Sequence, residues 1–335
     1  MRIAIVYNEP GISSADLDVL VQRDAVQEAL QAAGHLCQPI ACNLDLAPLD
    51  EQLREFKPDV VFNLVESLAG TDRLAVLVPM LLDARRIAYT GATALAMLAS
   101  SDKLQVKQRL AALGLPTPDW YSMGSDHIAL VPGCYIVKAR YEHASLGIDD
   151  AAVVTVDSAN KLCGIIADRS RQFGAEMFAE RFVPGREFNL SVMETKNHGC
   201  RTMAPAEIDF SGFPDGKPKI VNFDAKWTES AFEYQATPRS FDFKDEDAML
   251  LAKLDQLTRT VWQAFDLTGY ARVDYRVDES GQPYILELNT NPCLSPDAGF
   301  AAAVAQSGSS FANAIESIVE VAALRHSTSL LATGH

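Results

Sequence analysis

The chain has 335 residues, of which 48% are hydrophobic and 22% charged, as in a globular protein with enough material for two or three domains. Its formal net charge of −15 argues against a nucleic-acid partner, which would need a basic face, and no apolar run is long enough to cross a membrane. Six scattered cysteines and six dispersed histidines predict buried, reduced thiols in the cytoplasm and no zinc site.

The first part of the chain alternates strand and helix patterns. Residues 59–66, DVVFNLVE, form a continuous apolar run, which is typical of a strand buried in a parallel sheet. Val19 and Leu30 fall on one apolar stripe of a helix that ends at Gly34. These patterns predict a small α/β domain that ends near residue 95. Its predicted elements are a strand over 2–7, a helix over 16–33, a strand over 59–66 and a helix over 73–84.

The middle part begins with a helix start signal. Asp102 is an N-cap residue for a helix that runs to Leu113, and GLPTPDW then stops this helix with a glycine and two prolines. The segment RYEHASLGI separates later strands as a loop. The other predicted elements are strands over 134–139, 152–156 and 176–183 and a helix over 158–172.

The last part of the chain begins with an irregular segment, and helix and strand patterns follow it. Prolines, glycines and aromatic residues interrupt short strands over 186–244. Amphipathic periodicity and alternation then return. The predicted elements are a helix over 245–265, strands over 269–277 and 284–289, a helix over 308–324 and a loose tail over 326–335.

The two strands YARVDYRV and YILELN, joined by DESGQP, predict a hairpin. A two-residue turn at 280–281 places Asp274 opposite Glu287 and Arg272 opposite Asn289 on one face. Simple alternation puts Ile285 on this same face. The other face is a core face, with Val273, Tyr275 and Val277 against Leu288, Leu286 and Tyr284.

The opposed acids have two interpretations. Directly opposed carboxylates repel each other, so a cation between them is favoured, and Asp, Glu and Asn oxygens are ligands of Mg²⁺ or Mn²⁺ rather than zinc. The alternative is a solvent-facing polar side on which Arg272 neutralises its neighbours. The irregular segment NTNPCLSP after the strand favours the metal site, because ligands are often bound by irregular backbone at strand ends.

The order and spacing of several motifs resemble one enzyme family. The motifs are VFNLVESLAG, YTG, SDKLQVKQRLAALGLPTP, VKARYEHASLG, AERFVPGREFNLSV, NFDAKW and GYARVDYRV…GQPYILELNTNPCLSP. Together they resemble the D-alanine–D-alanine ligase branch of the ATP-grasp ligases. The resemblance implies an α/β (α+β) ATP-grasp fold, with an N-terminal α/β domain and two subdomains that clamp ATP. It assigns 1–95 to the first domain, 96–185 to the central subdomain and 186–325 to the C-terminal subdomain with the metal site.

The resemblance also implies a reaction. ATP phosphorylates a carboxylate, and an amine then displaces phosphate from the acyl phosphate to form a peptide or amide bond. Asp274, Glu287 and Asn289 match the ligands of two Mg²⁺ or Mn²⁺ ions that bridge the ATP phosphates. Arg272 matches an arginine that stabilises the oxyanion of the tetrahedral intermediate.

Further residues of the ATP site are implied by the same resemblance. Lys226 matches a lysine that reaches the γ-phosphate, and the irregular region 205–240 corresponds to a lid that excludes water. Lys103 and Lys138 match lysines that hold α- and β-phosphate oxygens. Ser145 lies in EHASLG, the counterpart of a loop that closes over the phosphates. The implied phosphate-side residues are Lys103, Lys138, Glu142, Ser145 and Lys226.

The segment ERFVPGRE resembles the adenine and ribose site of the family. The resemblance implies that Glu180 accepts from the adenine amino group, and that Arg181 and Val183 offer backbone groups. It further implies that Glu187 binds the ribose hydroxyls. Phe182 packs either on the adenine or in an ordinary core.

The substrate residues depart from the family pattern. The glutamate that grips the first amino acid has no counterpart in YNEPGISSADLDVL, where the candidates are Asp16, Asp18 and Glu9. Glu66 replaces a substrate-side histidine and favours a cationic or hydroxylated partner. Residues 297–299 replace a serine-containing stretch, which makes a second amino-acid carboxylate less favourable there. The assigned substrate residues are Asp16, Glu66 and Asp297.

The sequence therefore predicts an ATP-dependent carboxylate–amine ligase with altered substrate residues. Its partners are small carboxylates and amines such as amino acids, with no nucleic acid and no membrane, and the resemblance implies a homodimer. The alternative is a non-catalytic ATP-binding sensor, although retention of the predicted metal ligands argues against it. A dehydrogenase is excluded, because no GxGxxG follows the first strand.

Overall fold

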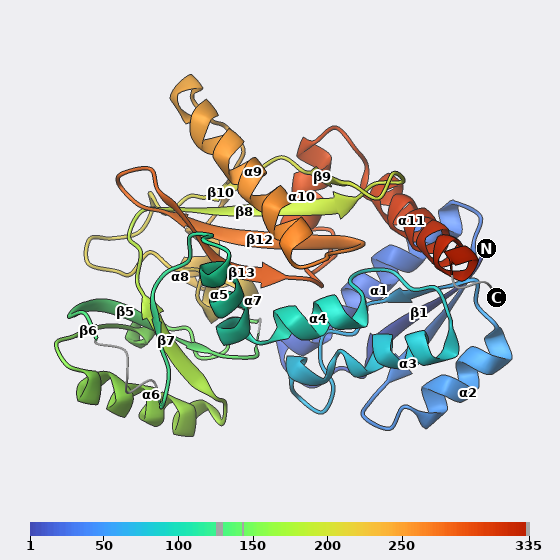
Figure 1. The fold of residues 1–335 in the computed structure, drawn as a ribbon, viewed down its shortest axis with the longest axis horizontal. Coiled ribbons are helices and arrows are strands. Elements are labelled where there is room, and N and C mark those ends of the chain that lie inside the picture. Colours follow the sequence, from blue (N-terminus) through green and yellow to red (C-terminus); the bar gives the residue numbers. More distant parts are fainter. Residues whose placement is uncertain (125–129, 143, 333–335) are drawn as a thin grey trace.

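The computed structural model describes residues 1–124, 130–142 and 144–332, which form three sheets with helices packed on them (Figure 1). The mixed helix and sheet class predicted from the sequence is therefore confirmed. One sheet falls within each of the three predicted units, whose boundaries remain a prediction.

The N-terminal sheet is parallel, with the strand order β2-β1-β3. The sequence predicted β1, α1 and β3 but missed β2 and α2. In β2 only Ile40 and Cys42 are buried, and Pro39 is tolerated because β2 is an edge strand, so its apolar pattern is interrupted. The elements are β1 (Arg2–Asn8), α1 (Ser14–Ala32), β2 (Leu36–Cys42), α2 (Ala47–Phe56), β3 (Val60–Asn63), the 3-10 helix η1 (Asp72–Leu74) and α3 (Leu77–Arg85).

The central sheet is antiparallel, with the order β4-β7-β5-β6, and α6 packs on it. Asp102 caps α5 as predicted, since its carboxylate accepts from the backbone N–H of Leu104 at 3.0 Å. The elements are α4 (Ala94–Ser101), α5 (Lys103–Ala112), β4 (Trp120–Tyr121), β5 (Gly133–Ala139), η2 (Asp150–Ala152), β6 (Val153–Val156), α6 (Ala159–Phe173) and β7 (Met177–Arg181).

The C-terminal sheet has the order β11-β10-β8-β12-β13, and β9 also pairs with β8. The apolar side of α9 packs on this sheet through Leu254 and Val261, which are fully buried. The elements are β8 (Arg186–Glu194), β9 (Cys200–Thr202), β10 (Ala206–Ile208), α7 (Phe223–Trp227), α8 (Phe232–Gln235), β11 (Arg239–Ser240), η3 (Asp245–Asp247), α9 (Ala248–Ala264), β12 (Tyr270–Val277) and β13 (Pro283–Asn289).

The β12–β13 hairpin has the predicted pairing at the end far from its turn. Asp274 pairs with Glu287, and Arg272 pairs with Asn289. The prediction of a two-residue turn at 280–281 is wrong, however, and the pairs nearer the turn are shifted by one residue.

Two local irregularities explain this result. The backbone N–H of Asp278 donates to the carbonyl of Gln282 at 3.1 Å, which leaves a three-residue loop between them. A β-bulge next to Tyr275 then restores the predicted register. Because the three-residue loop shifts the pairs between the turn and the bulge, Tyr275 pairs with Ile285 rather than Leu286, and Ile285 lies in the core instead of sharing the face of the acids.

The end of the chain returns to the N-terminal sheet. Ile315 and Val319 of α11 share one core with Ile3 and Phe62, so α11 packs beside the N-terminal sheet (Figure 1). The predicted loose tail is wrong for residues 326–332, which continue α11, while 333–335 lie outside the described residues. The last two elements are α10 (Gly299–Gln306) and α11 (Phe311–Ala332).

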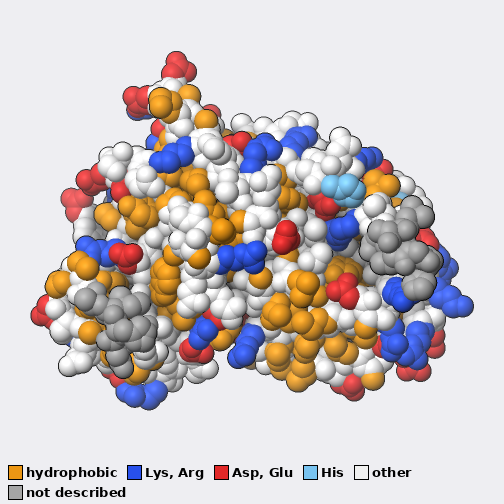
Figure 2. All heavy atoms as spheres, in the orientation of Figure 1, with side chains coloured by type: hydrophobic (Ala, Val, Ile, Leu, Met, Phe, Trp, Pro, Cys, Tyr) orange, Lys and Arg blue, Asp and Glu red, His pale blue; other side chains and the backbone are white. Residues whose placement is uncertain are grey.

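The surface agrees with the acidic composition. On the face shown in Figure 2, Lys and Arg side chains are interspersed with Asp and Glu and form no single basic patch. The six cysteines are free, but only Cys42 is buried, so the expectation of buried thiols is wrong for the other five, which are half-buried. Within the described ranges, none of the helices combines the length and apolarity that crossing a membrane requires.

Candidate active site

A cleft of about 740 Å³ is lined by residues from all three sheets and the loops beside them. It brings together nearly all of the predicted site residues. Lys103 and Glu142 do not line it, but the Lys103 ammonium contacts both a cleft carboxylate and the Glu142 carbonyl. The predicted residues that line the cleft are Asp16, Glu66, Lys138, Ser145, Glu180, Arg181, Phe182, Val183, Glu187, Lys226, Arg272, Asp274, Glu287, Asn289 and Asp297.

The predicted metal ligands lie on the β12–β13 hairpin, where pairing places Asp274 against Glu287. Asp274 is only 8% exposed, so it does not face open solvent, although Arg272 does pair with it as the alternative interpretation expected. Asn189 of the neighbouring strand β8 donates to Asp274 Oδ1 at 2.8 Å, which sequence reasoning missed. The pairing of β12 with β13 and the contact from β8 thus orient the carboxylate oxygens of Asp274 and Glu287 toward the cleft.

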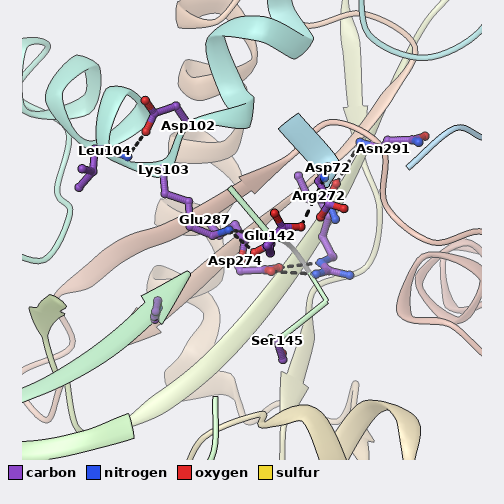
Figure 3. Close-up of polar contacts among 12 residues, drawn as sticks. Asp72, Asp102, Lys103, Leu104, Glu142, Ser145, Arg272, Asp274, Glu287 and Asn291 are labelled. Carbon is purple, nitrogen blue, oxygen red and sulfur yellow. Dashed lines mark hydrogen bonds and ion pairs between the residues drawn. The ribbon is translucent and has the colours of Figure 1, made fainter. Parts of the chain in front are cut away.

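Arg272 forms a two-point ion pair with Asp274 (Figure 3). Its Nε and Nη2 donate to the two carboxylate oxygens at 2.7 and 2.9 Å. Burial acts to lower the pKa of Arg272, but Asp274 and Glu287 outweigh it and hold this pKa above its usual value. The arginine therefore keeps a positive charge beside the paired acids.

Lys103 approaches the same acids from the start of α5. Its Nζ lies 3.3 Å from Glu287 Oε1 and donates to the carbonyl of Glu142 at 2.6 Å (Figure 3). The helix start is fixed because Arg140 donates to the capping carboxylate of Asp102 at 2.7 Å. Burial acts to raise the pKa of Asp102, but the Arg140 guanidinium more than offsets it, so this pKa is lowered.

Glu180 is held by two lysines deep in the cleft. The ammonium of Lys107 lies 2.6 Å from Glu180 Oε2, and Lys138 pairs with Oε1. Lys107 also donates to the Thr117 hydroxyl at 3.0 Å, which in turn donates to the carbonyl of Ile285 at the β13 bulge. Burial acts to raise the pKa of Glu180, but the two lysines lower it overall.

Sequence reasoning missed Lys107, although one signal was present. Lys107 lies four residues after Lys103, a spacing that places both side chains on one face of α5. Burial lowers the pKa of Lys107 overall, although the negative charge of Glu180 acts to raise it.

The predicted adenine and ribose residues lie together at one end of the cleft. The backbone N–H of Arg181 donates to the carbonyl of Asp119 at 2.7 Å, so only its carbonyl can face a ligand. Glu187 pairs with the buried Arg276 at 3.0 Å, and the Arg276 guanidinium lies over the Phe182 ring. Burial raises the pKa of Glu187, although Arg276 opposes this shift.

The loop 142–147 contacts the region 205–240 that the resemblance predicts as a lid. The Ser145 hydroxyl donates to the carbonyl of Val221 at 3.3 Å, and the Trp227 indole donates to the carbonyl of Ala144 at 3.1 Å. The carboxylate of Glu142 points toward the N-terminal unit, where it accepts from the hydroxyl of Thr71 and the backbone of Asp72. Residue 143 lies outside the described residues.

Lys226 lies on the short helix α7, in the region predicted to form a lid, and lines the cleft together with Asp274 and Glu287. The pKa of Lys226 is lowered by burial and by the nearby Arg272, against the opposing attraction of Glu287, Asp274 and Glu187. The predicted lid lysine and hairpin acids therefore meet in one site.

An acidic cluster lies at the other end of the cleft. Gln22 donates to Glu66 at 2.9 Å and to Asp18 at 3.0 Å, and its carbonyl oxygen accepts from the backbone of Leu294 at 2.9 Å. The Ser295 hydroxyl also donates to Asp18, at 2.7 Å. Burial raises the pKa of Glu66 to about 8, with a contribution from the nearby acids.

Of the three N-terminal candidates, Asp18 is the one in this cluster. Asp16 lines the cleft but completes the capping box of α1, where its carboxylate accepts from Ser13. Glu9 accepts instead from Asn43 at 3.1 Å in an exposed contact. At Asp297 the backbone carbonyl, and not the carboxylate, accepts from Arg239 at 3.0 Å.

The donor chemistry of the hairpin fits magnesium or manganese. Asp274, Glu287 and Asn289 offer only oxygen ligands, and lysines beside them suit an anionic phosphate chain. Within the described residues, no three His, Cys, Asp or Glu side chains form a metal-holding group by themselves.

Similar proteins point to one family. Residues 111–320 match the family described as D-ala D-ala ligase C-terminus. The D-alanine–D-alanine ligase of Gluconobacter oxydans is 30% identical over 300 residues, covering 88% of this chain and 90% of that protein. The uncharacterized protein y4sG of Sinorhizobium fredii is 27% identical over 312 residues, covering 90% of this chain and 88% of that protein.

Solved structures agree on the fold. The D-alanine–D-alanine ligase of Bacillus anthracis complexed with ATP has a TM-score of 0.73 at 19% identity, covering 98% of this chain and 99% of that chain. The corresponding enzyme of Coxiella burnetii has a TM-score of 0.71 at 18% identity, covering 99% of this chain and 97% of that chain. The ATP-grasp fold is thus confirmed. The chain belongs to the D-alanine–D-alanine ligase family and is an ATP-dependent ligase.

Proposed function

We propose that this ligase joins the carboxylate of one small molecule to the amine of another, with amino acids as the substrate class. The observation that carries the proposal is the pairing of Asp274 with Glu287 beside Arg272, in a cleft that also receives Lys226. Phosphoryl transfer depends on charge neutralisation and alignment more than on a protein nucleophile, and this arrangement supplies both.

Asp274, Glu287 and Asn289 are the proposed holders of up to two Mg²⁺ or Mn²⁺ ions. When bound, such ions neutralise phosphate charge and align the transferring phosphoryl group. The oxygen-only donor set and its position beside lysines support this assignment.

We assign the phosphate chain of ATP to Lys103, Lys138, Lys226 and Ser145. The carboxylate substrate attacks the γ-phosphorus, and the bond to ADP breaks. The amine nitrogen then attacks the acyl carbon, the bond to phosphate breaks, and the nitrogen loses a proton. Arg272 donates to the oxyanion that forms between these two steps.

Adenine and ribose are assigned to the end of the cleft lined by Phe182 and Val183. Arg181 offers its backbone carbonyl and Glu187 its carboxylate. Glu180 already binds Lys107 and Lys138, yet a carboxylate has further lone pairs with which to accept from an adenine amino group. Glu142 is better explained as a link between the phosphate loop and the N-terminal unit.

The identity of the two substrates follows less directly from the structure than the ATP site does. Relatives at 27–30% identity bear the name D-alanine–D-alanine ligase, which makes D-alanine the first substrate to test. At this end of the cleft Asp18 favours a substrate with an ammonium or hydroxyl group, while Glu66, whose pKa of about 8 keeps it mostly protonated at neutral pH, favours a hydroxyl group. A cytoplasmic homodimer is part of the proposal.

The test is ADP and phosphate release with Mg²⁺ and ATP across a panel of D- and L-amino acids and other amines. Release that requires both a carboxylate and an amine, with a joined product identified by mass spectrometry, supports the proposal. ATP binding without turnover on the whole panel would revive the sensor alternative, which membership of the family does not favour.

A further inference from the structure

The carboxylate of Glu180 pairs with two ammonium groups that differ in their access to the cleft. Lys107 Nζ lies 2.6 Å from Oε2, and Lys138 pairs with Oε1. The Lys107 side chain is 1% exposed and does not line the cleft, whereas that of Lys138 is 13% exposed and lines it. A bound ligand can therefore contact Lys138 directly, while Lys107 remains out of its reach.

A second contact fixes the ammonium of Lys107. It donates to the Thr117 hydroxyl at 3.0 Å, and this hydroxyl donates to the carbonyl of Ile285 at 2.9 Å. The backbone N–H of Ile285 donates to the carbonyl of Pro116 at 2.8 Å, so the segment 116–117 is bound to strand β13. Lys107 is thus held between this segment and Glu180, and its displacement would break both contacts.

The two lysines supply more positive charge than Glu180 needs. Burial acts to raise the pKa of Glu180, but the attraction of Lys107 and of Lys138 lowers it overall, so this carboxylate is ionised at neutral pH. Two ammonium groups on one carboxylate leave one excess positive charge, which a nearby anion stabilises. The phosphate chain assigned to Lys138 is such an anion. Lys138 can therefore leave Oε1 for phosphate while Lys107 stays on Oε2.

We propose that Lys107 is a positioning residue for recognition of the nucleotide base. It holds Glu180 by Oε2, and Oε1 accepts from the amino group of adenine once Lys138 turns to the phosphates. This inference deepens the proposed function and rests on its assignment of the nucleotide to this end of the cleft. Hypoxanthine, which carries a carbonyl in place of that amino group, presents an acceptor to the ionised carboxylate and is therefore disfavoured.

The experiment compares the two bases in variants of the two lysines. Wild type, Lys107→Met and Lys138→Met are titrated with ADP and with IDP in the presence of Mg²⁺, by calorimetry. Methionine is a flexible, unbranched side chain that removes the charge while still filling the space. Lys244→Met is the control, because the Lys244 side chain is 82% exposed. Lys107→Met is expected to fold, since Lys138 still pairs with Glu180.

The ratio of the two Kd values separates positioning from a merely structural role. Wild type and the control are expected to bind ADP at least about 10-fold more tightly than IDP, and Lys107→Met to reduce this preference to less than about threefold. Lys138→Met should weaken both nucleotides by similar factors and keep the preference, because both carry the same phosphates. A wild type without the preference overturns the proposal, as does an equal loss of both affinities in Lys107→Met. The expected pattern in a protein that forms no joined product would support the role of Lys107 and count against the ligase function.

A crystal structure of the wild type with Mg²⁺ and ADP is a second test, which does not depend on the folding of any variant. Lys107 is expected to stay within about 3 Å of Glu180 Oε2, with Oε1 on the adenine amino group and Lys138 at a phosphate oxygen. A Glu180 carboxylate turned away from the base, or Lys138 still bound to Oε1, would overturn the proposal.

Discussion

Buried charges in the cleft are fixed by partners from distant parts of the chain. Lys107 of α5 holds Glu180 of β7, and Arg276 of β12 holds Glu187 of β8. Loss of the only ionic partner of a buried charge costs about 3–5 kcal/mol, and Glu180 is protected against this because Lys138 also pairs with it. These ion pairs therefore allow charged side chains to stay ionised inside the folded protein.

Glu287 is the residue on which the proposed metal site most directly depends. Glu287→Gln is expected to lower kcat by at least about 100-fold and to raise the Mg²⁺ concentration needed for half-maximal rate, because an amide oxygen carries no charge for the cation. ADP release measured over a Mg²⁺ series tests this expectation.

The control for this variant is Glu246→Gln, since the Glu246 side chain is 75% exposed and lies outside the cleft. Both variants should remain folded at the assay temperature, which circular dichroism melts check. Turnover close to wild type in Glu287→Gln would remove Glu287 from the metal site.

Glu66 predicts a pH dependence of stability. Its pKa is about 8 in the folded protein against 4.5 for an ordinary glutamate, so the folded state binds more protons between these values. The stability it contributes is complete below pH 4.5 and is lost as the pH rises through 8. Glu66→Gln should therefore gain stability relative to wild type as the pH rises. Urea unfolding near pH 5 and pH 9 tests this, and an equal difference at both pH values would contradict it.

At the residue scale, the sequence predicted side chains whose partners are local and missed those whose partners are remote. Asp274 and Glu287 follow from alternation in one hairpin. Gln22 and Arg239 could not be predicted, because their contacts at Leu294 and Asp297 join segments far apart in the sequence. Asp18 was only one of three candidates until the fold placed Gln22 and Ser295 beside it.

At the scale of elements, the β12–β13 hairpin shows how the Asp274–Glu287 pair was predicted correctly although the predicted turn was wrong. The three-residue loop displaces the register by one residue, and the β-bulge restores it before Asp274. A bulge inverts which face the next side chain occupies, and alternation alone does not reveal it. For this reason Ile285 was placed on the wrong face while Glu287 was placed correctly.

The position of Lys226 in the proposed lid predicts that catalysis and nucleotide binding can be separated. Asn222 caps α7, accepting from the backbone of Ala225 at 2.9 Å, and this short helix carries Lys226 into the cleft. Lys226→Ala is expected to lower kcat by about 100-fold, because it removes a charge assigned to the transferred phosphate. The Kd for ADP should change by less than about threefold, since ADP lacks the γ-phosphate.

Single-turnover phosphate release and calorimetry with ADP measure these two quantities. Lys244→Ala is the matched control, because the Lys244 side chain is 82% exposed. A variant of Lys226 that loses ADP affinity and keeps its rate of phosphoryl transfer would contradict the assignment.

At the scale of the whole molecule, the C-terminal helix α11 packs back against the N-terminal unit. Arg325 of α11 donates to Glu194 of the C-terminal sheet at 2.8 Å and to the carbonyl of Tyr89 in the N-terminal unit at 2.9 Å. His35 of the N-terminal unit contacts Glu316 of the same helix at 2.8 Å. Many of the strands and helices were predictable from local patterns, but this long-range closure was not, since a polar segment such as HSTS reads as a tail.

This closure predicts which truncations the protein tolerates. Removal of residues 311–335 takes Ile315, Ile318 and Val319 out of the N-terminal core, where each is at most 2% exposed. Three such side chains contribute roughly 1.5–3 kcal/mol each, which is comparable with the roughly 5–15 kcal/mol that stabilises a typical domain. This truncation is therefore expected to yield protein without a cooperative thermal transition. Removal of 327–335, which begins with exposed side chains, should preserve the transition and nucleotide binding, and equal behaviour of the two truncations in circular dichroism melts would contradict the role of α11.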